Sequence, residues 1–345
     1  MSSQEGGLAV AVTRAIPDAG LALLRAAPEI TELRIWPEEL PPTPDQLAGL
    51  LRGCDGAVTL LSDRIDAAVL DREPRLRVVA NFAVGYDNID VDAATARGVV
   101  VCNTPDVLTH ATADCAFALL MASARRIVEA ADYVQAGRWR TWGPQLLLGQ
   151  ELHGRTLGIV GPGRIGTEVA RRGTGFGMRL LGWSRSGRLS DEAAALGMTA
   201  VALDVLLAES DFVSLHVPLS EETRHLIGER ELGLMRPTAI LVNTARGPVV
   251  DQAALVRALV AGTIAGAGLD VTDPEPLPAD HPLVREPRAI VVPHIGSATV
   301  SARDEMARLA ASGVLAALRG ERPGNLVNPQ ATPNRSTRAA EPADR

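Results

Sequence analysis

Short apolar runs alternate with amphipathic stretches along most of the chain. In the first hundred residues the runs cover 8–12, 57–61, 76–80 and 99–102. From residue 157 onward the same alternation returns, with runs at 157–160, 180–183, 212–216, 239–243, 265–270 and 290–293. Near-continuous apolar runs joined by helices are typical of parallel strands that are covered on both faces. The pattern therefore predicts an α/β protein with two doubly wound parallel sheets.

The amphipathic stretches predict the helices. We expect helices over about 18–27, from Asp45 after a proline-rich loop, and over 299–318. A long Ala- and Leu-rich stretch at about 110–136 is also expected to be helical. Residues 329–345 are rich in Pro, Ala, Ser, Thr and charge, so we expect a disordered tail.

Composition narrows the chemistry. The 345 residues allow two domains, and all 34 basic residues are arginine, against 41 acidic ones and a net charge of -7. The absence of lysine from the sequence excludes Schiff-base chemistry and the lysine-bearing phosphate loop. The acidic balance argues against a nucleic-acid partner.

The cysteines, the apolar runs and the first residues of the chain bear on the cellular compartment and on metal binding. The three cysteines are odd in number and form no close pair, which argues against disulfides and zinc and favours a reducing cytoplasm. No apolar run is long enough to span a membrane, and the first residues lack the features of a signal peptide. We expect a cytoplasmic protein without a membrane partner and without a metal.

A glycine-rich loop is the sharpest local motif. The strand at 157–160 leads directly into Gly161, Gly163 and Gly166, and residues 167–172 are expected to be helical. In such loops the first glycine permits a tight turn, the second lets a pyrophosphate approach, and the third allows close helix packing. With this strand and helix on either side, the motif predicts dinucleotide binding.

The end of the next strand bears on which dinucleotide is bound. Ser184 stands where NAD-binding proteins carry an acid, and Arg185, Ser186 and Arg188 follow. An acid would repel a 2′-phosphate, whereas arginines and hydroxyls bind one. We therefore expect NADP(H) to be favoured over NAD(H), the alternative being a solvated loop.

Three charged residues lie at or after the ends of later strands, where α/β proteins bind ligands: Arg246, Glu275 and His294. Taken singly, each has a structural alternative. Taken together with two further segments, Phe-Ala-Val-Gly-Tyr-Asp-Asn-Ile-Asp at 82–90 and Ser-Leu-His-Val-Pro-Leu at 214–219, they resemble the D-isomer-specific 2-hydroxyacid dehydrogenases. The resemblance covers about residues 8–328.

Within that family, residues 60–66, 105–114 and 184–186 are similar to the glyoxylate/hydroxypyruvate reductase branch. The resemblance implies NAD(P)H-dependent reduction of a small 2-oxoacid to the 2-hydroxyacid. Phosphoglycerate dehydrogenase, phosphite dehydrogenase and a non-enzymatic, dinucleotide-sensing corepressor remain as alternatives.

The resemblance also implies roles for the site residues. Arg246 would bind the substrate carboxylate and carbonyl oxygen, His294 would act as general acid, and Glu275 would orient the imidazole. The backbone amides of Val84 and Gly85 would bind the substrate carboxylate. The expected coenzyme contacts are Thr112, Gly161, Gly163, Arg164, Ile165, Gly166, Ser184, Arg185, Ser186, Val217, Pro218, Thr244, Ala245, Asp270 and Gly296.

The family architecture implies a substrate domain of residues 1–104 and 297–328, with a flavodoxin-like fold, and a Rossmann coenzyme domain of residues 105–296. The helix near 110–124 matches the region through which the family dimerises, so a homodimer is expected. His216 is assigned a structural or coenzyme-lining role. Trp139 and Trp142 would either cap a neighbouring subunit's substrate pocket or simply pack.

Overall fold

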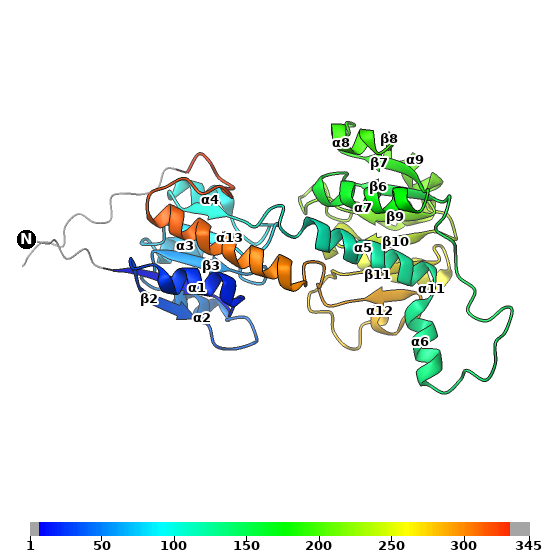
Figure 1. Ribbon diagram of the computed structural model, residues 1–345, viewed down its shortest axis with the longest axis horizontal. Helices are drawn as coiled ribbons and strands as arrows, with labels where there is room; N and C mark the ends of the chain where they lie inside the picture. Colours follow the sequence, from blue (N-terminus) through cyan, green and yellow to red (C-terminus); the bar gives the residue numbers. More distant parts are fainter. Residues whose placement is uncertain (1–6, 332–345) are drawn as a thin grey trace, which may run out of the picture. The chain divides into compact units, whose positions relative to one another are not determined.

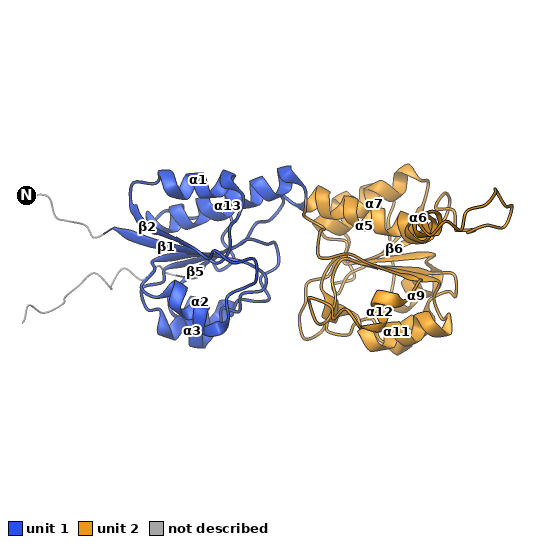
Figure 2. Ribbon diagram, turned by 90° about the horizontal axis from the view of Figure 1, so that it is seen from below, with its two compact units in different colours: residues 1–108, 299–345 blue, residues 109–298 orange. Residues whose placement is uncertain are grey.

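The computed structural model describes residues 7–331 (Figure 1). The chain divides into two compact units, one formed by residues up to 108 and from 299 onward, the other by residues 109–298 (Figure 2). Most of the tail expected to be disordered, from residue 332 on, lies outside the described residues. None of the described helices is both long and apolar enough to cross a membrane.

The first unit is built on a five-stranded sheet in the order β2-β1-β3-β4-β5. Its strands are β1 (Leu8–Val12), β2 (Ile30–Ile35), β3 (Gly56–Thr59), β4 (Val78–Asn81) and β5 (Val100–Cys102). Its helices are α1 (Asp18–Ala26), α2 (Pro44–Leu51), α3 (Ala67–Arg72), α4 (Val91–Ala96) and α13 (Val300–Leu318). The pairs are all parallel, in the flavodoxin-like order. Figure 2 shows α1 and α13 on one face and α2 and α3 on the other.

The second unit carries a seven-stranded parallel sheet in the order β12-β11-β10-β9-β6-β7-β8. Its strands are β6 (Thr156–Val160), β7 (Arg179–Trp183), β8 (Thr199–Ala200), β9 (Phe212–Leu215), β10 (Ile240–Asn243), β11 (Gly266–Leu269) and β12 (Ala289–Val291). Its helices are α5 (Thr109–Ala124), α6 (Ile127–Gln135), α7 (Arg164–Gly175), α8 (Asp191–Ala195), α9 (Leu203–Glu209), α10 (Glu229–Leu234), α11 (Gln252–Ala261), α12 (Pro282–Arg285) and the 3₁₀ turn η1 (Gly247–Val249). The expected fold class, two doubly wound parallel sheets, is confirmed.

Alternating strand residues build a core on each face of the second sheet. Ile159 packs into the cluster beneath α5 and α7, whereas its neighbour Val160 packs into the cluster beneath α9 and α11. Both side chains are fully buried, because successive strand residues point to opposite faces and both faces are covered. The order of the strands reverses between β6 and β9, so the glycine-rich loop after β6 lies at the switch point where such sheets bind ligands.

The stretch expected to be helical over 110–136 is divided into two helices. The structure has α5 and α6, separated at Arg126, whose φ of 52° is left-handed. Next to this break, the backbone amide of Gln150, 26 positions away in the sequence, donates to the carbonyl oxygen of Ala124 at 2.8 Å. Helical periodicity reveals neither this contact nor the left-handed turn at Arg126.

Two strands were not expected at all. They are β2 and β8, and each lies at an edge of its sheet. An edge strand is less completely covered than a central one, and in residues 30–35, Ile-Thr-Glu-Leu-Arg-Ile, polar residues interrupt the apolar ones. A search for continuous apolar runs therefore finds the central strands and misses these edges.

Candidate active site

The ends of adjacent strands β10, β11 and β12 place the expected catalytic residues in one part of the second unit. Arg246 follows β10, and Glu275 lies in the loop after β11. His294 follows β12, and its Nδ1 lies 2.5 Å from Oε1 of Glu275. This contact is a charge-assisted hydrogen bond when the imidazole is protonated. It leaves Nε2 as the ring nitrogen that can meet a ligand.

Asp270 fixes the loop that carries His294. Its carboxylate, at the end of β11, accepts hydrogen bonds from the amides of Ile295 and Gly296 at 2.6 and 2.8 Å. The backbone amide of His294 also donates to the Asp270 carbonyl oxygen at 3.0 Å. Asp270 is 2% exposed, and burial raises the pKa of its carboxyl group. The backbone of His294 is left-handed, with φ of 53°. It is held by the hydrogen bonds that Asp270 accepts from His294 itself and from the next two residues.

Gly296 lies where there is little room for a side chain. A Cβ there would lie 2.8 Å from Oδ2 of Asp270 and 3.4 Å from Cγ2 of Thr112. The structure thus brings Thr112, from α5, close to Gly296 and Asp270.

The turn that carries Arg246 is folded by Asn243, the last residue of β10. Its side-chain amide donates to the carbonyl oxygen of Arg246 at 2.9 Å, and its side-chain oxygen accepts from the amide of Ala245 at 3.0 Å. Thr244, between them, is buried, and within residues 7–331 its hydroxyl has no hydrogen-bond partner. A buried hydroxyl of this kind fits a ligand that supplies the missing bond. Sequence analysis did not single out Asn243, although the Asn-Thr-Ala-Arg-Gly turn contains it.

The glycine-rich loop has the shape that a pyrophosphate requires. Gly161 has a φ of 90°, and a Cβ there would lie 2.8 Å from Cγ1 of Val217. A Cβ on Gly166 would lie 2.4 Å from the carbonyl oxygen of Gly161. Above Gly163, by contrast, no atom of the described chain lies within 4 Å of where a Cβ would be.

Gly163 also precedes the first turn of α7, where the described residues provide no side-chain cap. Open space beside an uncapped helix N-terminus suits an anion. The residues of the loop therefore fit the diphosphate of a dinucleotide.

A cavity of about 330 Å³ opens at the end of β7, lined by Trp183, Ser184, Arg185, Gly187 and residues 200–202. The Ser184 hydroxyl donates to the carbonyl oxygen of Arg188 at 2.7 Å and lies 3.2 Å from the Ser186 hydroxyl. Arg185 is largely exposed, and its Nη1 lies 3.7 Å from Oε2 of Glu222. Sequence analysis missed Glu222, because its neighbour across the loop is 37 residues away in the chain.

His216 is a neutral histidine at ordinary pH. Its Nε2 lies 2.8 Å from the Ser214 hydroxyl, and burial lowers its pKa to about 3. The backbone of His216 lies against Gly161, since a Cβ on Gly161 would be 2.9 Å from the carbonyl oxygen of His216. A histidine that is neutral at ordinary pH supports the glycine-rich loop and does not supply a proton.

Val84 and Gly85 belong to the first unit, in the loop after β4. The carbonyl oxygen of Val84 accepts from the side chain of Asn103 at 2.7 Å, and that of Gly85 from Asn81 at 2.8 Å. Sequence analysis named neither asparagine.

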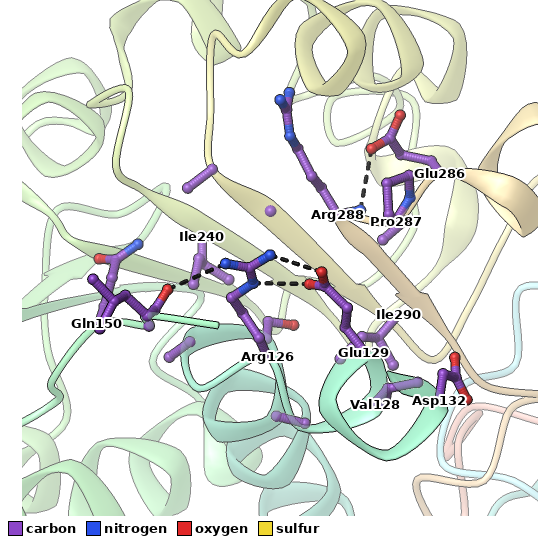
Figure 3. A pocket seen from close by; sticks show the side chains of 18 of the residues that line it. Arg126, Val128, Glu129, Asp132, Gln150, Ile240, Glu286, Pro287, Arg288 and Ile290 are labelled. Atoms are coloured by element: carbon purple, nitrogen blue, oxygen red, sulfur yellow. Dashed lines mark hydrogen bonds and ion pairs between the residues drawn. The ribbon is translucent and has the colours of Figure 1, made fainter. Parts of the chain in front are cut away.

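The second unit holds a larger cavity, of about 790 Å³, which contains none of the expected site residues (Figure 3). Its walls come from the end of α5, α6, residues 148–150 and residues 284–290. Figure 3 shows Arg126 in a two-bond pair with Glu129, at 2.8 and 2.7 Å. Trp139 and Trp142 lie in the segment after α6 and are 61% and 77% exposed, so they do not pack inside this unit.

Comparison with known proteins agrees with this geometry. Residues 117–296 match the D-isomer specific 2-hydroxyacid dehydrogenase, NAD binding domain. Glyoxylate reductase from Korarchaeum cryptofilum is 54% identical over 320 residues, which cover 92% of this chain and 95% of that protein.

Among solved structures, the TT0316 protein from Thermus thermophilus is 46% identical with a TM-score of 0.87, covering 93% of this chain and all of that one. An NADPH-dependent glyoxylate/hydroxypyruvate reductase from Sinorhizobium meliloti, in complex with NADP and malonate, is 33% identical with a TM-score of 0.81. It covers 95% of this chain and 99% of that one. The chain belongs to the D-isomer-specific 2-hydroxyacid dehydrogenase family, in its glyoxylate reductase branch.

Proposed function

We propose that this protein reduces glyoxylate or hydroxypyruvate to the corresponding 2-hydroxyacid with a nicotinamide dinucleotide as hydride donor. The single observation that carries the proposal is the pairing of His294 with Glu275, in the loops after β12 and β11, while Arg246 follows the neighbouring strand β10 of the same sheet. An acid, its orienting carboxylate and a guanidinium are the groups that carbonyl reduction requires.

In the proposed mechanism, Arg246 binds the substrate carboxylate and carbonyl oxygen through its planar guanidinium. A reduced nicotinamide coenzyme, when bound, would supply the hydride for the carbonyl carbon. His294 would give its Nε2 proton to the carbonyl oxygen, so that this oxygen becomes a neutral hydroxyl group and the product keeps only its carboxylate charge. Glu275, at 2.5 Å from Nδ1, keeps the ring in the orientation that this transfer needs.

We infer that the coenzyme is held by Gly161, Gly163 and the first turn of α7 at its diphosphate, and by Thr112, Thr244, Asp270 and Gly296 toward the nicotinamide. NADP(H) is proposed over NAD(H), because Ser184 stands where an acid would repel the 2′-phosphate and Arg185 lies in the same cavity wall. The relative from Sinorhizobium meliloti, solved with NADP, supports this proposal. Glu222 opposes it, since a 2′-phosphate must compete with its carboxylate for Arg185.

We further propose a homodimer in the cytoplasm, with residues 1–104 and 297–328 as substrate domain and 105–296 as coenzyme domain. α6 and the segment after it project from the body of the second unit (Figure 1). Large apolar side chains are exposed along both, with Ile127 at 56%, Val134 at 52% and Leu148 at 64%. Such a surface is typical of a subunit interface. The free thiols of all three cysteines suit a reducing compartment.

The test is a panel of 2-oxoacids, including glyoxylate, hydroxypyruvate and phosphohydroxypyruvate, run with NADH and with NADPH. Consumption of reduced coenzyme with glyoxylate or hydroxypyruvate supports the proposal. Tight coenzyme binding without turnover of any 2-oxoacid would overturn it in favour of a dinucleotide sensor.

A further inference from the structure

The loop after β4 presents two backbone amides that its own fold leaves unused. Within the described part of the chain, neither the amide of Val84 nor that of Gly85 donates a hydrogen bond. Three consecutive carbonyl oxygens of the loop are all engaged. Ala83 accepts from the amide of Thr104 at 2.8 Å, Val84 from Asn103 Nδ2 at 2.7 Å, and Gly85 from Asn81 Nδ2 at 2.8 Å.

Because the peptide group is planar, the hydrogen bonds to these carbonyl oxygens also fix the directions of the following amides. In a trans peptide the C=O and the following N–H lie in one plane and point in opposite directions. Holding the Val84 carbonyl oxygen therefore aims the Gly85 N–H the other way. In the same manner, the bond from Thr104 to the Ala83 carbonyl aims the Val84 N–H. Both donors take their direction from residues just after β5.

Asn103 is itself firmly anchored. Its carbonyl oxygen accepts from Asn325 Nδ2 at 2.7 Å, and its amide donates to the Asn325 carbonyl oxygen at 3.2 Å. Asn325 is buried and also donates to the carbonyl oxygen of Leu309 in α13. The side-chain amide of Asn103 thus has a fixed base, as a residue must have if it is to orient another group.

A second asparagine closes the loop from the other side. Asn81 is fully buried, and its side-chain oxygen accepts from the Thr59 hydroxyl at 3.2 Å. Its amide donates both to Gly85 and to the side chain of Asn88, at 2.8 and 3.0 Å. Asn88 in turn donates to the carbonyl oxygens of Leu60 and Asp63 at 3.1 and 2.9 Å. The loop is therefore tied to its neighbour after β3 and cannot turn freely.

We infer that Asn103 is a positioning residue for the substrate carboxylate, acting through the Val84–Gly85 peptide. The inference rests on the proposed function, which makes the Val84 and Gly85 amides the receptor for that carboxylate. At position 103 this role requires an uncharged side chain that can donate a hydrogen bond. Aspartate has nearly the same shape, but its carboxylate would repel both the Val84 carbonyl oxygen and the substrate anion.

The test compares Asn103→Ala and Asn103→Asp with the parent enzyme. We expect Asn103→Ala to raise KM for glyoxylate about tenfold, as loss of one aligned bond to a charged ligand should. Asn103→Asp should raise KM more than Asn103→Ala does. KM for the coenzyme should stay unchanged in both, because the glycine-rich loop lies in the other unit.

Asn328→Ala is the matched control. Asn328 is also fully buried in the first unit, and it too bonds backbone, accepting from the Val101 amide and donating to the Val99 carbonyl oxygen. It makes no bond to the substrate loop in the described structure. This variant should lower Tm without raising KM for glyoxylate.

Binding of oxalate, a non-reducible two-carbon dicarboxylate, measured by calorimetry on the coenzyme complex, gives a readout that needs no turnover. Weaker oxalate binding by Asn103→Asp keeps the inference testable if Asn103→Ala fails to fold. The inference is overturned if both folded Asn103 variants keep the parent's KM and oxalate affinity, or if Asn328→Ala raises KM equally. Failure of the proposed function looks different, because the parent itself would then reduce no 2-oxoacid.

Discussion

At the residue scale, each functional side chain of this site is oriented by hydrogen bonds to a neighbouring residue. His294 is held at its backbone by Asp270 and at its ring by Glu275, so one nitrogen is left to face a ligand. Its neighbour in function, Arg246, is placed by a turn that Asn243 folds. Each functional side chain therefore has a second residue that fixes its direction.

Loss of the acid is the first prediction. His294→Ala should lower kcat by roughly 100- to 10,000-fold, because the variant lacks the proposed general acid that protonates the carbonyl oxygen as hydride arrives. Coenzyme affinity, measured by fluorescence titration, should change little. His153→Ala, an exposed histidine of the same unit, is the control and should keep parental kcat. Near-parental turnover by His294→Ala would remove this residue from the mechanism.

Arginine geometry gives a second prediction. Arg246→Lys keeps the charge but loses the planar two-bond fork, so kcat/KM for glyoxylate should fall by at least about tenfold. Steady-state kinetics measures the loss directly. A lysine variant as active as the parent would make Arg246 a structural cation.

The contact between Arg185 and Glu222 leads to a third prediction, on coenzyme preference. Glu222→Gln should raise the ratio of kcat/KM for NADPH over NADH by about two- to fivefold, since an exposed ion pair at 3.7 Å is weak. Arg185→Ala should shift the ratio toward NADH. Glu221→Gln, the adjacent exposed glutamate, should leave it unchanged. Were both Glu222→Gln and Arg185→Ala to keep the parental ratio, Arg185 would not contact the 2′-phosphate.

At the scale of elements, two glycines of the β6–α7 loop, Gly163 and Gly166, have separable roles. Gly163 has a φ of -80°, which alanine adopts readily, and open space where its Cβ would be. Gly166 has no such space, because its Cβ would lie 2.4 Å from a backbone oxygen. One position therefore concerns the ligand and the other concerns packing.

The fourth prediction follows from that difference. Gly163→Ala should keep the parental Tm but weaken NAD(P)H binding by about tenfold or more, because a methyl group takes the place of the diphosphate. Gly166→Ala should lower stability by about 1–3 kcal/mol through overpacking. Thermal unfolding and coenzyme titration of both variants separate the two effects. Equal losses of Tm would show that the loop is only a structural turn.

Some elements could be predicted from the sequence and others could not. Central strands were recognisable because both of their faces are apolar, and the glycine-rich loop because strand and helix surround it. The edges β2 and β8 depend on pairing partners elsewhere in the chain, and helical periodicity does not reveal the left-handed turn after α5. The same holds for Asn103 and Glu222, whose roles come from contacts across loops and have no local pattern.

For the whole molecule, the exposed apolar surface of α6 and the segment 138–148 leads to a fifth prediction. The protein should sediment as a dimer, and Leu148→Glu, which puts a charge on a side chain that is 64% exposed, should shift it toward monomer. Val260→Glu, on α11 and 69% exposed, is the matched control and should remain dimeric. A parent that sediments as a monomer would contradict the proposal.

The central claim is that this chain is a 2-oxoacid reductase whose acid is His294. The most direct measurement is the rate of NADPH and NADH oxidation with glyoxylate and hydroxypyruvate, for the parent and for His294→Ala side by side. The account predicts steady turnover by the parent and loss of nearly all turnover in the variant, with coenzyme binding intact in both. A parent that binds coenzyme but reduces neither substrate, or a variant that reduces them as fast as the parent, would contradict it.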